Sequence, residues 1–290
     1  MTEVTAAVES GGTKCRAAVH DENLVVVDEV RLPTTTPDET LDGLVDFLRP
    51  FDVAALGVAS FGPLIVDRAS PDYGSMASTP KPGWSGARIL GRLADGLGVP
   101  AEIQTDVEAA AVAEYARGAG QGVSCVIYIT VGTGIGIGVA VDGVPYRGVD
   151  HIEMGHIPVE RHPDDTFAGR CPFHGACLEG LASGPAIGER WGSPAEDLGD
   201  RPEVWAMEAD YLAQLASVLV YSFAPERILY SGGVGARPGF ADLIGKRLQE
   251  RLNGYSVSNS TNPNLVATAA LGNEAGLTGA GLLAQSLLPA

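Results

Sequence analysis

The chain has 290 residues, of which 45% are hydrophobic and 6% aromatic, as in a globular protein with an aliphatic core. Its 36 acidic and 19 basic residues give a formal net charge of −17, which argues against nucleic acid or an anionic membrane surface as a partner. The N-terminus carries no basic segment followed by an apolar stretch, and four cysteines make a poor disulfide framework, so we expect a cytoplasmic protein.

The first predicted elements are two buried strands joined by a glycine-rich bend, in VTAAVESGGTKCRAAV (4–19). A helix is predicted next, in TPDETLDGLVDFLRP (36–50). Thr36 suits its N-cap, Pro37 suits its first position, and apolar residues then recur at helical spacing. A further strand, AALGVASFGP (54–63), runs into a turn.

The second half of the chain repeats this pattern. CVIYITVGTGIGIGVAV (125–141) predicts another pair of strands around a Gly-Thr turn, and RILYSGGVG (227–235) corresponds to the strand at 54–63. Further helices are predicted at about 107–117, 203–223, 238–252 and 275–287.

Strands followed by helices, twice over, predict two α/β domains. We place the boundary at the glycines near 118–120, which gives a smaller domain over 1–118 and a larger one over 119–290. The last helix is a candidate to pack back on the first domain. A cleft between two such domains is the expected ligand site.

The glycine-rich turns predict phosphate binding. Glycine lets backbone N–H groups approach an anion closely, and the threonine adds a hydroxyl. For a single turn, a tight hairpin that merely needs glycine is the simpler explanation. Two equivalent turns, with a third glycine-rich turn at 231–235, favour a triphosphate site instead. The P-loop and dinucleotide motifs do not occur in the sequence.

Asp106, in QTDVEAAAVAEYARG, stands where a predicted strand gives way to an alanine-rich helix. The structural explanation is an N-cap, since aspartate is favoured there and the helix dipole stabilises its charge. A catalytic role is compatible with that position, because phosphoryl transfer requires a carboxylate that orients the attacking hydroxyl and accepts its proton late.

The segment CPFHGACLEG predicts a metal site. Cys171, His174 and Cys177 supply three ligands within seven residues, and zinc takes four such nitrogen and sulfur ligands tetrahedrally. The fourth ligand would be His156, with His151 and His162 as alternatives. A redox pair is less favoured because the cysteines lack C-x-x-C spacing. A closed four-ligand site would organise the structure and take no part in the chemistry.

The turns ESGGTK and ITVGTGIG, followed by EMGH and the Cys/His cluster, resemble the ROK family of sugar kinases from Ala6 to Ala284. The resemblance implies the two-domain actin-like ATPase or hexokinase fold, which is ribonuclease H-like and holds its ligands in the inter-domain cleft. It also implies Mg²⁺ with ATP, structural Zn²⁺ and a homodimer. Repressor members carry a DNA-binding segment before the first strand; this chain starts at that strand, so we expect a kinase.

The same resemblance implies a role for each site residue. Asp106 is the implied catalytic base, and Glu9 helps to organise magnesium. The implied nucleotide-binding residues are Glu9, Gly11, Gly12, Thr13, Lys14, Gly132, Thr133, Gly134, Gly232 and Gly233. The implied sugar-binding residues are Gly62, Pro63, Lys81, Trp84, Thr105, Glu153 and Glu179. The implied zinc ligands are His156, Cys171, His174 and Cys177, in an insertion over about 150–180.

Alternatives remain for some of these side chains. Trp84 could equally pack in the core. Glu153 and Glu179, taken alone, could be solvated surface charges. Because they flank the metal ligands, we expect loss of zinc to weaken sugar binding before ATP binding.

Several departures from the family's glucokinase pattern resemble its bacterial fructokinase branch. Thr105 precedes Asp106, Glu9 replaces the usual aspartate, and RHPDD, CPFHG and EGLASGPAI fit that branch. The resemblance implies ATP-dependent 6-phosphorylation of D-fructose, with mannose as a second substrate. The alternatives are a mannokinase, glucokinase or N-acetylmannosamine kinase, a sugar sensor without catalysis, and a polymerising or chaperone-like ATPase.

Overall fold

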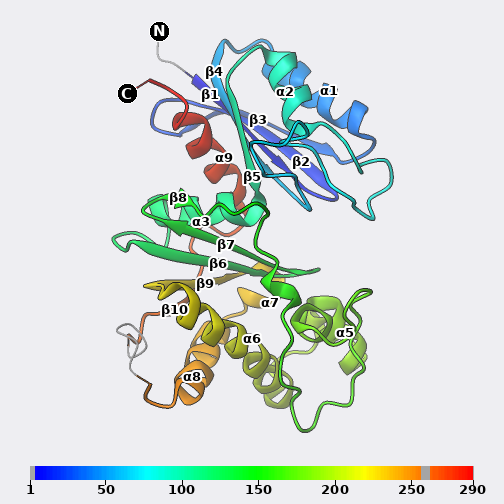
Figure 1. Ribbon diagram of the computed structural model, residues 1–290, viewed down its shortest axis with the longest axis vertical. Coiled ribbons are helices and arrows are strands. Elements are labelled where there is room, and N and C mark those ends of the chain that lie inside the picture. Colours follow the sequence, from blue (N-terminus) through cyan, green and yellow to red (C-terminus); the bar gives the residue numbers. More distant parts are fainter. Residues whose placement is uncertain (1–3, 256–261, 290) are drawn as a thin grey trace. The chain divides into compact units, whose positions relative to one another are not determined.

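The computed structural model describes residues 4–255 and 262–289, and Figure 1 labels its elements. The strands are β1 (Val4–Ser10), β2 (Lys14–His20), β3 (Val26–Pro33), β4 (Val53–Ser60), β5 (Ala101–Thr105), β6 (Cys125–Val131), β7 (Ile135–Val141), β8 (Val144–Pro145), β9 (Arg227–Ser231) and β10 (Val266–Thr268). The α-helices are α1 (Pro37–Leu48), α2 (Ile89–Leu97), α3 (Asp106–Arg117), α4 (Leu178–Ala182), α5 (Gly184–Trp191), α6 (Pro202–Phe223), α7 (Gly232–Gly235), α8 (Phe240–Leu252) and α9 (Ala275–Gln285). Single 3₁₀ turns occupy Met154–His156, Ala195–Asp197 and Gly272–Glu274.

The chain divides into two compact units. Unit 1 comprises Met1–Ala113, Pro145–His151 and Asn273–Ala290, and unit 2 comprises Glu114–Val144 and Ile152–Gly272. The division falls earlier in α3 than the boundary expected at 118. The reason is Glu114, whose carboxylate accepts hydrogen bonds from the N–H groups of Ala119 (2.8 Å), Ala270 (3.1 Å) and Leu271 (2.7 Å) in unit 2.

The sheet of unit 1 has the strand order β3-β2-β1-β4-β5. β1 pairs antiparallel with β2 and parallel with β4, so the hairpin strands lie beside the strands that feed helices. Successive side chains of a strand point to opposite faces. Accordingly, Val8 packs with the leucines of α1, whereas Ala7 packs with Leu277 and Ala280 of α9. Helices α1 and α9 lie on opposite faces of the sheet (Figure 1).

Small residues bring α9 close to this sheet. A Cβ atom on Gly57 of β4 would lie 1.8 Å from the carbonyl oxygen of Ala280, and one on Gly279 would lie 2.0 Å from that of Ala109 in α3. Helix α9 therefore packs directly on the backbone of β4 and α3, within unit 1. Helix α9, the last helix predicted from the sequence, thus belongs to unit 1, which also contains the N-terminal strands.

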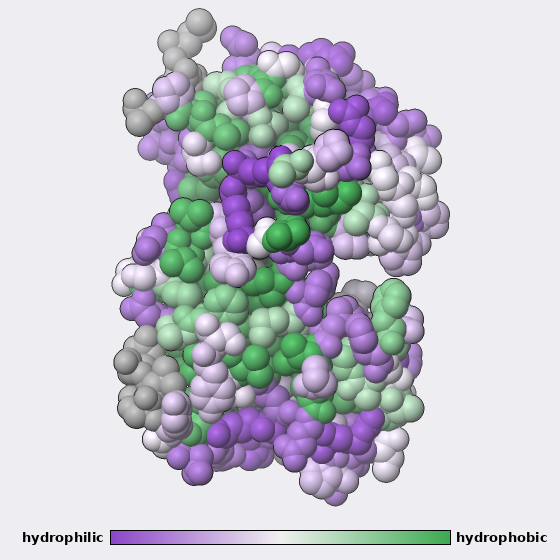
Figure 2. All heavy atoms as spheres, in the orientation of Figure 1, coloured by the Kyte–Doolittle hydropathy of each residue, from purple (hydrophilic) through white to green (hydrophobic). Residues whose placement is uncertain are grey.

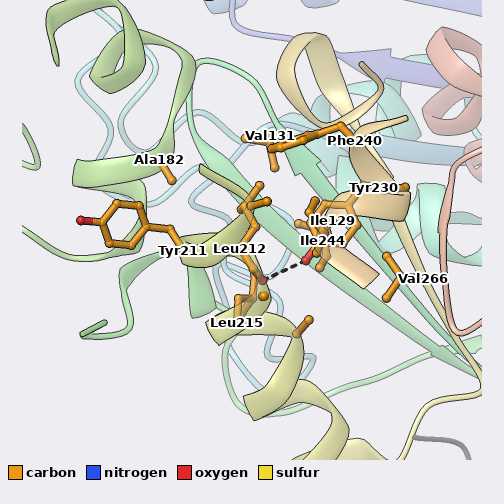
Figure 3. Close-up of a cluster of buried hydrophobic side chains, with 14 of the residues drawn as sticks. Ile129, Val131, Ala182, Tyr211, Leu212, Leu215, Tyr230, Phe240, Ile244 and Val266 are labelled. Atoms are coloured by element: carbon orange, nitrogen blue, oxygen red, sulfur yellow. Dashed lines mark hydrogen bonds between the residues drawn. The ribbon is translucent and has the colours of Figure 1, made fainter. Parts of the chain in front are cut away.

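The sheet of unit 2 has the order β10-β9-β6-β7-β8, which repeats the plan of unit 1. β6 and β7 form the antiparallel hairpin, and β9 runs parallel to β6. Its core lies between this sheet and helices α6 and α8, where the Tyr230 hydroxyl donates a hydrogen bond of 3.0 Å to the carbonyl oxygen of Leu212 (Figure 3). The duplicated arrangement inferred from the repeated turns is confirmed.

The predicted strand pairs and the long predicted helices are confirmed as β1–β2, β6–β7, α1, α3, α6, α8 and α9. The sequence analysis missed β3, β8, β10, α2, α4, α5 and α7. Strand β3 has a mixed and largely exposed face, and α5 is short and opens with Gly184-Pro185, so neither gives a long periodic signal. Hydrophilic and hydrophobic residues are interspersed on the face drawn in Figure 2. No helix in the described ranges has the length and apolarity needed to cross a membrane.

Candidate functional site

The first phosphate turn, Gly11-Gly12-Thr13, joins β1 to β2 in unit 1. The N–H of Gly11 donates to the carbonyl oxygen of Lys14 at 3.0 Å, and a Cβ atom on Gly11 would lie only 2.7 Å from that oxygen. Thr34 braces the turn, because its hydroxyl donates to the Gly11 carbonyl at 2.7 Å. Gly12 and Thr13 are exposed, so the tip of the turn is open to a ligand.

Lys81 lies against this turn. Its Nζ donates to the carbonyl oxygens of Gly12 at 2.6 Å and Thr34 at 3.3 Å. These bonds place the ammonium group on the phosphate turn, and they explain Lys81 as a brace for that turn. Neither hydrogen bond supports the predicted direct contact of Lys81 with sugar.

Trp84 is fully buried. Its indole N–H donates to the carbonyl oxygen of Thr35 at 2.9 Å, and its ring contacts Phe61 edge-on at a centroid distance of 5.4 Å. A side chain with no exposed surface offers no face on which a sugar ring can stack. The burial of Trp84 therefore favours the core-packing alternative over sugar stacking.

Asp106 is the first residue of α3, directly after β5. The N-cap position belongs to Thr105, whose hydroxyl accepts a hydrogen bond from the N–H of Glu108 at 3.3 Å. Thr105 is buried, so this local capping accounts for its side chain. The Asp106 carboxylate accepts a hydrogen bond from the N–H of Val107, at 2.9 Å, and burial raises the pKa of Asp106 to about 6.

Glu9, at the end of β1, is the second carboxylate in this part of unit 1. Burial raises the pKa of Glu9, Arg16 opposes that rise, and the nearby charge of Asp106 adds to it. The distance between Arg16 Nη1 and Glu9 Oε2 is 3.5 Å. Two neighbouring carboxylates beside a phosphate turn are the oxygen ligands that Mg²⁺ prefers.

His151 is a residue whose place the sequence analysis did not foresee. Its Nε2 accepts a hydrogen bond of 3.2 Å from the N–H of Leu64, and a Cβ atom on Gly62 would lie 3.6 Å from the same nitrogen. A positive charge on this imidazole would lower the pKa of Asp106. The imidazole therefore lies beside the Gly62-Pro63 loop, whose peptide bond is cis. The histidine in HIEMGH was the available signal, considered only as a substitute zinc ligand.

The second phosphate turn, Gly132-Thr133-Gly134, joins β6 to β7 in unit 2. The N–H of Gly132 donates to the Gly134 carbonyl at 2.9 Å, and the Gly132 carbonyl accepts from the N–H of Gly184, at the start of α5, at 2.8 Å. The turn lines a pocket of about 1030 Å³. The residues around that pocket are Gly132, Thr133, Arg170, Gly184, Pro185, Gly188, Glu189, Gly192, Ser193, Pro194, Ala195, Glu196, Gly233 and Val234.

The third glycine turn follows β9 and contributes to the same unit. Gly232 has φ of +81°, and a Cβ atom on it would lie 2.5 Å from the carbonyl oxygen of Val131. Only glycine fits that position. Gly233 lines the pocket, whereas Gly232 packs closely against the end of β6.

The four expected zinc ligands lie together in unit 2. One nitrogen or sulfur atom from each of His156, Cys171, His174 and Cys177 lies within 4.8 Å of all the others. His156 Nδ1 is 3.7 Å from Cys171 Sγ and 3.5 Å from Cys177 Sγ. Tetrahedral Zn²⁺ with ordinary bond lengths separates its nitrogen and sulfur ligands by about 3.5 Å. The donor set and its spacing therefore fit zinc.

Glu179 connects this cluster to the second phosphate turn. Its Oε2 accepts a hydrogen bond of 2.9 Å from the N–H of Ile135, the first residue of β7, and its Oε1 lies 3.9 Å from His156 Nε2. A Cβ atom on Gly134 would lie 2.7 Å from Glu179 Oε2. Glu153 directly precedes the 3₁₀ turn that carries His156. It is exposed, and it interacts with another group of the protein.

Comparisons with known proteins agree with this arrangement. The sequence profile of the ROK family matches residues 5–287. The chain is 40% identical to a fructokinase of Pediococcus pentosaceus, over 97% of this chain and 98% of the relative. It is 41% identical to a fructokinase of Zymomonas mobilis, over 96% and 95%.

A solved structure shares the fold as well. The glucokinase of Streptomyces griseus, in complex with glucose and AMPPNP, is 26% identical to this chain and superposes with a TM-score of 0.71, covering 98% of this chain and 99% of the glucokinase. The two α/β units are therefore those of a two-domain sugar kinase fold. The duplicated sheets, the paired glycine turns and the match over almost the whole length show that the chain belongs to the ROK family.

Proposed function

We propose that the chain is an ATP-dependent fructokinase that transfers the γ-phosphoryl group of Mg·ATP to the 6-hydroxyl of D-fructose, with mannose as a second substrate. The proposal rests chiefly on the environment of Asp106. This side chain is a half-buried carboxylate with a pKa of about 6, next to Glu9 and on the same unit as the Gly11-Gly12-Thr13 turn. The fructokinases that the chain resembles at 40–41% identity support the choice of sugar.

Each unit would supply part of the reaction. Asp106 accepts the proton of the 6-hydroxyl as the new oxygen–phosphorus bond forms and the bond to ADP breaks. The turns Gly11-Gly12-Thr13 and Gly132-Thr133-Gly134 would each offer backbone N–H groups to phosphate. Glu9 would help to organise Mg²⁺, which when bound neutralises charge on the phosphates. Glu153 and Glu179 would accept hydrogen bonds from sugar hydroxyls, and His151 is added as a neighbour of the Gly62-Pro63 loop.

Zinc would have a structural role in this enzyme. His156, Cys171, His174 and Cys177 would complete its coordination shell and leave no open position for water. We further infer a homodimer, as the family resemblance implies, and a cytoplasmic location, in keeping with four cysteines that form no disulfide.

A sugar panel with coupled detection of ADP tests the proposal. We expect the highest kcat/KM with fructose, lower values with mannose, and little turnover of glucose or N-acetylmannosamine. Asp106→Asn should lower kcat by about 1000-fold, in the range expected for loss of a general base. A preference for another sugar would refute the substrate, and near-full turnover by a folded Asp106→Asn protein would refute the base.

A further inference from the structure

The pocket of unit 2 has an unusual balance of charge for a site that takes a nucleotide. Among its lining residues, Arg170 is the one cation and Glu189 and Glu196 are the two carboxylates, of which Glu189 lies 3.4 Å from Arg170 Nε. The remaining lining is glycine, proline and small or apolar side chains. A polyphosphate chain in such a pocket needs the arginine, because guanidinium groups bind phosphate oxygens through paired hydrogen bonds.

The backbone of Arg170 is fixed by its neighbours. Its N–H donates to the carbonyl oxygen of Gly180 at 3.0 Å, and the next residue, Cys171, exchanges backbone hydrogen bonds of 3.1 and 2.9 Å with Gly175. Cys171 is also a member of the metal cluster. The base of the arginine side chain is therefore anchored on both sides, between the zinc ligands and helix α4.

The guanidinium group of Arg170 keeps its hydrogen-bonding capacity. Its Nε lies 3.4 Å from Glu189 Oε1, and no side-chain hydrogen bond of Arg170 occurs within the described residues. The two side chains are 38% and 53% exposed, so this ion pair contributes little stability. A phosphate group could replace the carboxylate as the partner at small cost.

Three other cations, Lys81, Arg16 and Arg190, are engaged by protein groups. In unit 1, Lys81 donates to the carbonyl oxygens of Gly12 and Thr34, and Arg16 forms ion pairs with Glu9, Glu29 and Glu274. In unit 2, Arg190 is buried between Asp165 and Glu208. Arg170 is thus the cation that the pocket of unit 2 has to offer.

We propose that Arg170 binds the phosphate chain of the nucleotide and so determines affinity for the triphosphate, while the apolar wall of the pocket receives the base. This inference rests on the proposed kinase function and deepens it by naming a phosphate-binding side chain. It also links the metal cluster to the nucleotide, because Arg170 directly precedes Cys171.

Calorimetry with two ligands tests the role of Arg170. The zinc-loaded protein is titrated with Mg·AMP-PNP, which carries the phosphate chain, and with adenosine, which lacks it. We expect Arg170→Gln to weaken AMP-PNP binding by about 10-fold or more, as for loss of one charge-assisted hydrogen-bonded contact, and to change adenosine binding less than about 2-fold. Arg170→Lys, which keeps the charge, should recover part of the loss.

Glu189→Gln is the matched control, because it removes the ion pair and leaves the guanidinium group in place. It should bind AMP-PNP at least as tightly as the unaltered protein. Equal weakening of both ligands in Arg170→Gln, unchanged AMP-PNP binding, or a loss in Glu189→Gln as large as in Arg170→Gln would overturn the inference. If the unaltered protein phosphorylates fructose in any of these cases, the proposed function stands; if it binds no AMP-PNP, both fail together.

Discussion

The carboxylate of Glu179 accepts a hydrogen bond of 2.9 Å from the N–H of Ile135, the residue that follows the Gly132-Thr133-Gly134 turn. A side chain expected to contact sugar thereby also fixes the backbone that would contact ATP. The same carboxylate lies 3.9 Å from His156, a member of the metal cluster. The metal cluster, Glu179 and the Gly132-Thr133-Gly134 turn thus form one continuous set of contacts within unit 2.

The two roles of Glu179 can be separated by substitution. Glu179→Gln keeps an oxygen for the N–H of Ile135 and loses the charge, so it should raise the KM for fructose and leave the KM for ATP nearly unchanged. Glu179→Ala leaves that N–H without its partner, at a cost of about 1–3 kcal/mol, and should raise both KM values. Steady-state kinetics with each substrate varied in turn would check this, and an alanine variant that changes only the fructose KM would contradict it.

Zinc removal has a different expected outcome from the one derived from sequence. Sugar binding was expected to fail first, because Glu153 and Glu179 flank the metal ligands. With Glu179 bonded to Ile135 and Arg170 adjoining Cys171, we now expect chelation to weaken fructose and AMP-PNP binding together. Calorimetry on the metal-free protein would measure both affinities.

A control is needed to separate this effect from general unfolding. The far-UV circular dichroism spectrum of the metal-free protein should stay close to that of the zinc-loaded protein, and re-addition of zinc should restore both affinities. Loss of fructose binding with unchanged AMP-PNP binding would favour the original expectation.

Asp106 should give the enzyme an acid limb in its pH profile. The pKa of this carboxyl is about 6 in the folded protein, raised by burial, and only the ionised form can accept the proton of the sugar hydroxyl. We expect kcat/KM to be level above pH 7 and to fall about 10-fold for each pH unit well below 6. A profile that stays level to pH 5 would show that this carboxyl is not the base.

The same pKa predicts that Asp106 costs stability. Because its folded-state pKa lies above the ordinary value of 3.8, the folded protein binds the proton more tightly, and stability falls as pH rises from about 4 to 6. Asp106→Asn should therefore stabilise unit 1 at pH 7 by about 1–3 kcal/mol and have no such effect at pH 4. Urea unfolding at the two pH values would measure the difference.

A second buried carboxyl, that of Glu208, should make stability depend on pH over a higher range. Arg190 Nη1 lies 2.5 Å from Glu208 Oε1, and the same guanidinium pairs with Asp165 at 2.9 Å, so two carboxylates share one cation. Burial raises the pKa of Glu208 to about 8. Stability should thus decrease as pH rises from about 4.5 through 8, because the folded protein holds the proton that the unfolded chain releases.

Glu208→Gln should remove that dependence on pH. We expect its Tm to exceed that of the unaltered protein at pH 9 and to equal it near pH 4, where both side chains are neutral. Glu250→Gln is a suitable control, because that glutamate pairs with Arg247 on the surface. Equal destabilisation of Glu208→Gln at both pH values would show that Glu208 is needed as an ion.

Local patterns in the sequence determined the elements and the metal ligands. Alternating or continuous apolar runs predict β1, β2, β6 and β7, and the 3.6-residue spacing of apolar side chains predicts α1, whose N-cap Thr36 is confirmed. The spacing Cys-x-x-His-x-x-Cys brings three donors together within a single loop, so no distant contact is needed to foresee it. The equivalent Gly-Thr turns, 120 residues apart, predicted that the two sheets would share one strand order.

Tertiary structure decided which side chains face a ligand and which face the protein. Trp84 forms a hydrogen bond with Thr35, Lys81 with Gly12, and Glu179 with Ile135. The two residues of each pair are more than 40 residues apart in the chain. Sequence spacing carries no information on such pairs, because they depend on how the sheets and loops pack. Burial, which places the pKa of Asp106 near 6, is likewise a property of the packed unit.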